Sequence, residues 1–172
     1  RYHHLFADVL QAHLMKEQPE EIPGLHRRAS AWYEENGFTA DAVHHAFAAQ
    51  DVERAARLIE LAWAGMDRSR QSATWLRWAN RLPEELVRVR PVLCLGLAWA
   101  NLDAGELEAA DSWLRQAEHC LAKTADFIVT DKVEFHFSPG SIAAARTYLA
   151  LALGDMPGTI RYTHPPRHIS PQ

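Results

Sequence analysis

The sequence predicts an all-α protein, a right-handed superhelix built from antiparallel helix pairs. Along most of its 172 residues, apolar side chains recur at alternating steps of three and four, which is the period of an amphipathic helix. Glycine and proline separate these periods at short intervals. A helix pair buries one face internally and leaves another for the next pair, so a chain of such pairs grows as a solenoid.

The clearest pair lies between Pro91 and Leu121. Pro91 opens the first helix, and Gly105 provides a left-handed residue that ends it. One narrow face of the second helix carries five apolar residues: Leu107, Ala110, Leu114, Ala117 and Leu121. Because two of these are alanines, a neighbouring helix can approach closely.

The chain is expected to begin with four helices. The first runs from about Tyr2 to Glu17, with an apolar stripe of Leu5, Phe6, Val9, Leu10 and Leu14. The second begins near Ile22, ends at Gly37, and is expected to bury Leu25, Ala29, Trp32 and Tyr33. Thr39 is expected to cap the third helix and Asp51 the fourth.

The apolar period weakens between Gly65 and Ser72, which indicates a loop. A fifth helix carries Trp75 to Ala79, and Pro83 starts a short helical turn. The apolar residues of Lys123–Ser138 are spaced more like a strand, so either a lone hairpin or an aromatic loop is expected there. Helix resumes over Ser141–Gly154, and Thr163–Gln172 is predicted to be a disordered tail.

Degenerate internal repeats support the helix-pair interpretation. GELEAA at 105–110 has counterparts in GFTADA at 37–42, QDVERA at 50–55 and GDMPGT at 154–159. Each couples a turn residue to a small residue five positions later. The spacing between copies varies, so an ideal 34-residue array is excluded.

The composition limits the classes of function. The formal charge of −4 gives no overall attraction to nucleic acid, and no apolar run approaches the ~18 residues of a membrane span. We expect no signal peptide and a cytoplasmic location. Because the sequence starts at Arg1, we expect a fragment of a larger protein. Cys94 and Cys120 are interpreted as small buried apolar residues.

Four segments in order resemble the central helical region of MalT-like regulators in the LuxR family, a tetratricopeptide-like array. They are Arg1–Leu14, Leu25–Glu60, Thr74–Ala110 and Ala145–Tyr162. The resemblance implies three parts: residues 1–20 as the end of a preceding winged-helix module, 21–162 as a helical-repeat sensor or interaction domain, and 163–172 as a tail. After Tyr162 the chain departs from the family pattern, because Pro165 and Pro166 interrupt the expected helix.

The same resemblance implies that the parent protein is an ATP-dependent transcriptional activator. The chain itself lacks the G-x-x-x-x-G-K-[ST] phosphate loop, so we expect no cofactor in this segment. Its basic clusters are interleaved with acidic residues or lie at turns, so direct nucleic acid binding is not expected. An unknown small-molecule inducer, a protein partner or self-association is expected instead.

Metal and catalytic sites find little support in the sequence. His3 and His4, like His44 and His45, are adjacent and diverge by about 100° on a helix, so neither pair chelates one ion. No nucleophile has a base at an informative spacing. We therefore predict no catalytic, cofactor or metal residues and no enzyme.

Tryptophans are the better candidates for a binding site. Trp75 and Trp78 lie three residues apart with Arg81 nearby, and these three are the predicted ligand or partner contacts. The competing interpretation is that each tryptophan packs one helix on the next, and this is expected for Trp32, Trp63 and Trp113. A tetratricopeptide-like adaptor without a small ligand, and an enzyme on an α-α solenoid, remain the alternative functions.

Overall fold

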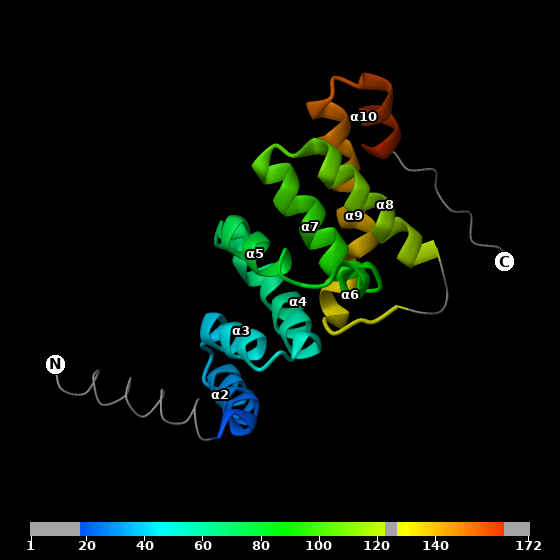
Figure 1. The fold of residues 1–172 in the computed structure, drawn as a ribbon. Coiled ribbons are helices and arrows are strands. Elements are labelled where there is room, and N and C mark those ends of the chain that lie inside the picture. The colour runs from blue at the N-terminus through cyan, green and yellow to red at the C-terminus, as the bar shows by residue number, and fades with distance from the viewer. Residues whose placement is uncertain (1–17, 123–126, 164–172) are drawn as a thin grey trace. The chain divides into compact units, whose positions relative to one another are not determined.

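The computed structural model describes residues 18–122 and 127–163, and within these ranges it contains helices and no strand. The predicted all-α class is confirmed. The elements are η1 (Pro19–Glu21), α2 (Ile22–Glu35), α3 (Thr39–Ala48), α4 (Val52–Arg68), α5 (Ser72–Ala79), α6 (Glu84–Arg88), α7 (Pro91–Ala104), α8 (Leu107–Ala122), α9 (Lys132–Ala152) and α10 (Met156–Thr163) (Figure 1). The predicted helix at Tyr2–Glu17 and most of the predicted tail lie outside the described residues.

The chain divides into two compact units, Arg1–Leu58 and Ile59–Gln172. In the first unit, α2 packs against α3 and the first turns of α4 belong to the same core. That core is made of small side chains: Ala42, Val43, Ala46, Ala55 and Ala56 are each at most 1% exposed. Ser30 is also fully buried on α2, where its hydroxyl donates to the Ala42 carbonyl at 2.8 Å. Small residues on both sides allow these helices to approach closely.

Helix α7 forms the centre of the second unit. It contacts α5, α6, α8 and α9, and eleven of its fourteen residues are buried. Gly96 lies against two tryptophans, because a Cβ at this position would be 2.7 Å from the Trp75 ring and 3.0 Å from Trp63. A helix that is apolar all round requires neighbours on every side, and α7 has them.

The repeated turn signal is confirmed at all four positions. Gly37, Gln50, Gly105 and Gly154 have φ of 78°, 58°, 80° and 72°, in the left-handed region. In each case the next residue donates its N–H back to the preceding helix, as Glu106 does to the Asn101 carbonyl at 2.9 Å. The small residues five positions after the first three turns are fully buried alanines: Ala42, Ala55 and Ala110.

Several local predictions about the first unit require correction. Thr39 does not cap α3: the helix starts at Thr39 itself, and the N-cap residue is Phe38, without a side-chain cap. Asp51 does cap α4, accepting the Arg54 N–H at 3.0 Å. Leu25 and Trp32, predicted to be buried, are 39% and 54% exposed, because α3 covers a different face of α2.

The prediction for the stretch before α9 is wrong over its second half. Phe127–Asp131 has no regular secondary structure, as the loop alternative required, but α9 begins at Lys132, nine residues before the predicted start at Ser141. Asp131 caps this helix by accepting the N–H groups of Val133 and Glu134 at 3.1 and 3.0 Å. Pro139 lies inside the helix. The strand-like alternation of Val133, Phe135 and Phe137 therefore misled the prediction.

The loop expected between Gly65 and Ser72 is shorter than predicted. Helix α4 continues to Arg68, and Arg70 takes a left-handed φ of 58° in the turn before α5. Helices α5, α6, α7 and α8 start and end close to their predicted positions.

A candidate effector or partner groove

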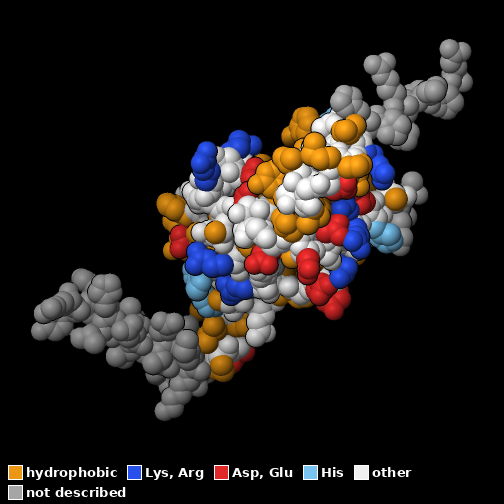
Figure 2. All heavy atoms as spheres, turned by 90° about the horizontal axis from the view of Figure 1, so that it is seen from above, with side chains coloured by type: hydrophobic (Ala, Val, Ile, Leu, Met, Phe, Trp, Pro, Cys, Tyr) orange, Lys and Arg blue, Asp and Glu red, His pale blue; other side chains and the backbone are white. Residues whose placement is uncertain are grey.

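A groove of about 250 Å³ opens between α8, α9 and α10 of the second unit. Its apolar lining comes from four residues: Leu107, Leu149, Ala150 and Leu153. Its polar lining comes from five: Glu108, Asp111, Arg146, Asp155 and Tyr162. Figure 2 shows that hydrophobic side chains gather over part of the surface while acidic and basic side chains lie beside them. We refer to the groove lined by these nine residues as the Arg146 groove.

Arg146 on α9 is the central charge of the groove. Its side chain is only 10% exposed and is held by two carboxylates of α8. Nε and Nη2 donate to the two Glu118 oxygens, each at 2.8 Å, and Nη1 donates to Asp111. A guanidinium bound in this bidentate way has little capacity left for an external anion. Its charge is balanced by Glu118 and Asp111 within the protein.

Asp111 connects Arg146 to the surface of α8, because it also pairs with Arg115 one turn later. Partial burial raises the pKa of the Asp111 carboxyl, but the hydrogen bonds from Arg146 and Arg115 outweigh burial and hold the pKa below its ordinary value. The hydrogen bond with Glu118 raises the pKa of Arg146 above its ordinary range. Both groups are thus fixed in their charged forms at neutral pH.

The rest of the groove offers apolar surface and hydrogen-bond acceptors. Leu153 is 64% exposed, and the carboxylate of Glu108 is at the exposed surface of α8. Asp155 accepts the Gly158 N–H at 3.0 Å at the start of α10. The groove can therefore receive a partly apolar group that carries hydrogen-bond donors.

The residues singled out from the sequence lie elsewhere in the second unit. Trp75 is fully buried, and its indole N–H donates to the Ile59 carbonyl at 2.8 Å. Its ring packs edge-on against Trp63, with centroids 4.7 Å apart. Trp78 is half-buried and Arg81 is exposed. Trp75 is thus a core residue without accessible surface, whereas a binding role for Trp78 and Arg81 stays a prediction.

The other tryptophans predicted to be packing residues behave in different ways. Trp63 is 3% exposed and belongs to the core. Trp113 is half-buried, with the Arg88 guanidinium 5.8 Å above its ring. Trp32 is more than half exposed. The packing interpretation therefore fails for Trp32.

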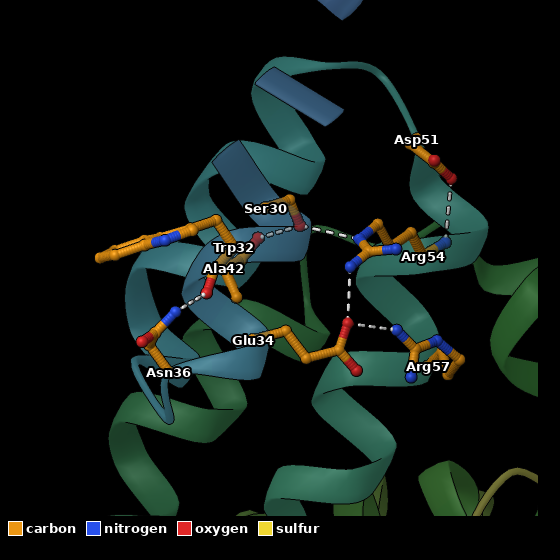
Figure 3. Close-up of polar contacts among 8 residues, drawn as sticks. All are labelled: Ser30, Trp32, Glu34, Asn36, Ala42, Asp51, Arg54 and Arg57. Carbon is orange, nitrogen blue, oxygen red and sulfur yellow. Dashed lines mark hydrogen bonds and ion pairs between the residues drawn. The ribbon is translucent and has the colours of Figure 1, made fainter. Parts of the chain in front are cut away.

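A second polar cluster lies in the first unit (Figure 3). Glu34 of α2 accepts from Arg54 at 2.5 Å and from Arg57 at 2.6 Å, and Arg54 also donates to Ser30 at 2.9 Å. Arg57 hydrogen bonding lowers the pKa of Glu34 despite some burial. These hydrogen bonds and ion pairs join α2 to α4, and the carboxylate of Glu34 is paired with Arg54 and Arg57. We therefore interpret the cluster as structural.

Two histidines also meet in the first unit. His26 Nδ1 and His45 Nδ1 are 2.8 Å apart, and the His45 ring stacks on Tyr33. Burial, together with the neighbouring His26 and His44, lowers the pKa of His45. Among the described residues, no group of three or more His, Cys, Asp or Glu side chains is arranged to hold a metal ion. His3, His4, His164 and His168 lie outside the described residues.

Cys94 and Cys120 are both buried, as the sequence suggested. Their thiols donate to consecutive carbonyls, those of Val87 and Arg88, at 3.3 and 3.2 Å. Contact with Cys120 and burial raise the pKa of Cys94.

No helix in the described part of the chain has the length and apolarity needed to cross a membrane.

Residue spacing alone does not reveal the Arg146 groove. Asp111 and Glu118 lie seven residues apart on one face of α8, which is a visible signal of an acidic stripe. Their partner Arg146 is 28 residues beyond Glu118, in α9, a helix whose start the sequence did not predict. Only the packing of α9 on α8 brings the three together.

Comparison with known proteins relates this chain to segments of larger proteins. It is 33% identical over 121 residues to the HTH-type transcriptional regulator MalT of Serratia proteamaculans, covering 70% of this chain. It is 30% identical over 161 residues, 90% of this chain, to MalT of Klebsiella pneumoniae (strain 342). No family model matches the chain, and no solved structure matches it.

The chain is also similar to a protein of another kind. It is 37% identical over 133 residues, 73% of this chain, to the serine/threonine-protein kinase PknK of Mycobacterium tuberculosis (strain CDC 1551 / Oshkosh). It spans only 12% to 16% of the length of these relatives. The chain thus resembles a segment of MalT-type transcriptional regulators, and the same type of segment occurs in a kinase.

Proposed function

We propose that this chain is a non-catalytic effector-sensing or protein-interaction segment of a MalT-like transcriptional activator of the LuxR type. The alignment with MalT of Klebsiella pneumoniae, which covers 90% of the chain, carries the proposal. The similarity to PknK supports the non-catalytic part. A segment shared by a DNA-binding regulator and a kinase is best explained by a role that both require, such as sensing or docking.

The proposed mechanism is a shift in populations. We infer that the helix pairs form a right-handed superhelix, as in tetratricopeptide-like arrays, and that an effector favours one curvature of it. An effector can shift such an equilibrium only by its difference in affinity for the two states. The Arg146 groove suits this role because it lies between three helices, so a bound ligand would resist any change in their spacing.

The parent protein is proposed to use ATP and to bind DNA through other segments. In this segment we propose no cofactor, no metal and no direct contact with nucleic acid or membrane, and a cytoplasmic location. The partner would be a small inducer or a protein, and the proposal includes self-association of the chain.

A thermal-shift screen of the folded chain against sugars, amino acids, nucleotides and aromatic metabolites tests the sensing role. A ligand that binds only the folded state stabilises it by about 2.7 kcal/mol at a hundred times its dissociation constant. We expect a specific hit that Leu153→Ser abolishes and Leu61→Ser preserves. Both leucines are exposed, at 64% and 43%, but only Leu153 lines the groove.

The same screen also tests the site predicted from the sequence. If Trp78→Ala or Arg81→Ala abolishes the shift while Leu153→Ser preserves it, the effector binds beside α5 rather than in the Arg146 groove. Absence of any hit with a well-folded chain would contradict small-molecule sensing and favour the second candidate function, a protein adaptor.

A specific feature of the second unit favours the adaptor. A shallow second groove runs along α9 and α10, lined by three aromatic residues, Trp99, Tyr148 and Tyr162, together with small side chains of α9. Tyr148 is 51% exposed, and the Trp99 N–H donates to Ser141 at 2.9 Å. Exposed, oriented aromatic rings are typical anchors for a protein partner.

A further inference from the structure

Two histidines from different helices share a hydrogen bond in the first unit. His26 of α2 and His45 of α3 approach through their Nδ1 atoms, which are 2.8 Å apart, and their ring centroids are 5.0 Å apart. The His45 ring also stacks on Tyr33 of α2, with centroids 5.2 Å apart. All three side chains are half-buried. The pair therefore belongs to the contact between α2 and α3.

The number of protons on this pair decides whether its hydrogen bond can form. A neutral imidazole has one N–H donor and one acceptor nitrogen, whereas an imidazolium has two donors and no acceptor. With both rings neutral, or with one ring protonated, one Nδ1 can donate while the other accepts. With both rings protonated, two N–H groups and two positive charges would face each other at 2.8 Å, so this contact cannot persist.

The charges that act on His45 come from α2 and α3. Burial, followed by the neighbouring His26 and His44, lowers the pKa of His45 below its ordinary value of 6.5, although Asp41 raises it. His44 is exposed, and its ring centroid is 5.3 Å from that of His45. Asp41 is exposed one turn before His45 on α3. The folded first unit therefore resists protonation of His45.

The charged groups of the neighbouring elements are already paired or face solvent. On α4, Arg54 and Arg57 both donate to Glu34. On η1, which packs against α2, Glu20 and Glu21 are exposed. These elements thus leave the balance of charge at His45 to the groups of α2 and α3.

We propose that the His26–His45 hydrogen bond is a proton-sensitive latch between α2 and α3, closed while at least one ring is neutral and released when both are protonated. The core of this unit is made of small side chains, among them Ala42, Val43 and Ala46. Small side chains bury little apolar area each, so a polar contact carries a larger share of the attachment. The latch lies in the first unit and the Arg146 groove in the second, so neither proposal depends on the other.

Acid should favour the open form because the folded site holds the pKa of His45 low. As the pH falls through 6.5, the unfolded chain takes up a proton that the folded site accepts only at lower pH. The equilibrium therefore shifts toward the open form between pH 6.5 and the lowered pKa, and below that pKa the shift is complete. It amounts to about tenfold for each pH unit by which the pKa is lowered.

Nitrogen NMR of the histidine rings in the full 172-residue chain tests the latch directly. At pH 7, one ring of the pair should carry a hydrogen on Nδ1 and the other should not. On acidification, His45 should titrate below pH 6.5. The proposal is overturned if both rings carry hydrogen only on Nε2 at pH 7, or if His45 titrates at or above pH 6.5.

His26→Asn separates the hydrogen bond from the second proton. The asparagine amide places a nitrogen or an oxygen at about the position of Nδ1, so it can pair with either form of His45 but takes up no proton itself. We expect the titration of His45 to move upward toward pH 6.5 in this variant. His119→Asn changes an exposed histidine of α8 in the second unit, and as the matched control it should leave His45 unchanged.

Hydrogen exchange measures the opening itself. Protection factors, which are corrected for the pH dependence of the chemical exchange rate, should fall in α2 and α3 between pH 7 and pH 5 and change much less in α7 and α8. In His26→Asn the fall should be smaller. An equal fall in wild type and His26→Asn would overturn the proposal. If His26→Asn does not fold, the ring tautomers and the His45 titration of the wild type decide.

Discussion

The α7–α8 pair and the stretch that leads into α9 lie in the same unit, yet different forces hold them. Between α7 and α8 the contact is apolar and local in sequence: Ala110, Leu114 and Ala117 are fully buried, and Gly105 turns the chain between the helices. The stretch before α9 is instead held by polar contacts with residues far away in the sequence. This difference explains why the structure of the α7–α8 pair can be predicted from the sequence and that of the stretch before α9 cannot.

Glu60 is the anchor of the second region. Its carboxylate is fully buried on α4 and accepts the backbone N–H groups of Thr130 and Asp131 at 2.6 and 3.0 Å. Arg90 donates to the same carboxylate at 3.1 Å and to the Thr130 hydroxyl at 3.1 Å. One acidic side chain thus satisfies two backbone amides and one cation inside the protein.

Replacing this anchor should have the largest effect on stability. Glu60→Gln removes the negative charge that Arg90 faces in the interior, and breaking a buried ion pair on one side costs about 3–5 kcal/mol. Urea denaturation should show this loss. Hydrogen exchange should show early loss of protection at Thr130 and Asp131, with α7 and α8 affected only by the lower global stability.

A double replacement separates the charge from the packing. Glu60→Leu/Arg90→Met removes both charges and should be less destabilising than Glu60→Gln, because no cation is left buried opposite a neutral group. Glu85→Gln, an exposed glutamate of α6, should be nearly neutral. Equal stability of Glu60→Gln and Glu85→Gln would contradict the assigned role of Glu60.

The apolar core around α7 should be destabilised by a larger side chain at Gly96. Gly96→Ala places a methyl group 2.7 Å from the rigid Trp75 ring and 3.0 Å from Trp63, so at least one indole must move. Overpacking of this kind costs about 1–3 kcal/mol, which a denaturation curve resolves.

Gly65→Ala provides the matched control for Gly96→Ala. Gly65 also lies within a helix, but a Cβ there has nothing within 4 Å. The exchange should stabilise the chain by up to about 1 kcal/mol through helix propensity. A stabilising effect of Gly96→Ala would show that the two tryptophans do not enclose α7 as described.

The start of α9 should depend on one capping side chain. Asp131→Ala removes the acceptor for the Val133 and Glu134 N–H groups and should cost about 1 kcal/mol. The first turn of α9 should then exchange faster. Asp131→Asn keeps an oxygen acceptor at the same position and should retain most of the stability, unless the charge of Asp131 rather than its hydrogen bonds matters.

The contrast between local apolar contacts and distant polar contacts also explains which features the sequence predicts. The turns at Gly37, Gln50, Gly105 and Gly154 and the small residues that follow the first three are local signals, and the internal repeats predict them; the structure gives each turn residue a left-handed φ and buries the three alanines. The sequence does not predict the early start of α9, because its apolar alternation is typical of a strand and its determinants lie elsewhere in the chain. The anchor at Glu60 is 70 residues from Thr130 in the sequence.

The candidate site, like the start of α9, depends on contacts between residues far apart in the sequence. Trp75 and Trp78 are predicted contacts because they are aromatic residues one turn apart, but such spacing is equally typical of a core, and Trp75 is fully buried. The Arg146 groove depends on contacts between α8 and α9 that no local period encodes. Exposure of Trp32 has a similar cause, since the face that α3 covers is decided by packing and not by the number of apolar residues on α2.

The smallest expected effect concerns pH and the Arg146 groove. Because the folded state holds the pKa of Asp111 below its ordinary value of 3.8, Asp111 contributes stability above that pH, and the contribution disappears as the pH falls through the lowered pKa. Asp111→Asn should therefore cost about 1 kcal/mol at pH 7, typical of a partly exposed ion pair. The gap between wild type and variant should close below pH 3.8. A gap that stays constant from pH 7 into that acidic range would show that the charge of Asp111 does not stabilise the folded state, and would contradict its assigned ion pair with Arg146.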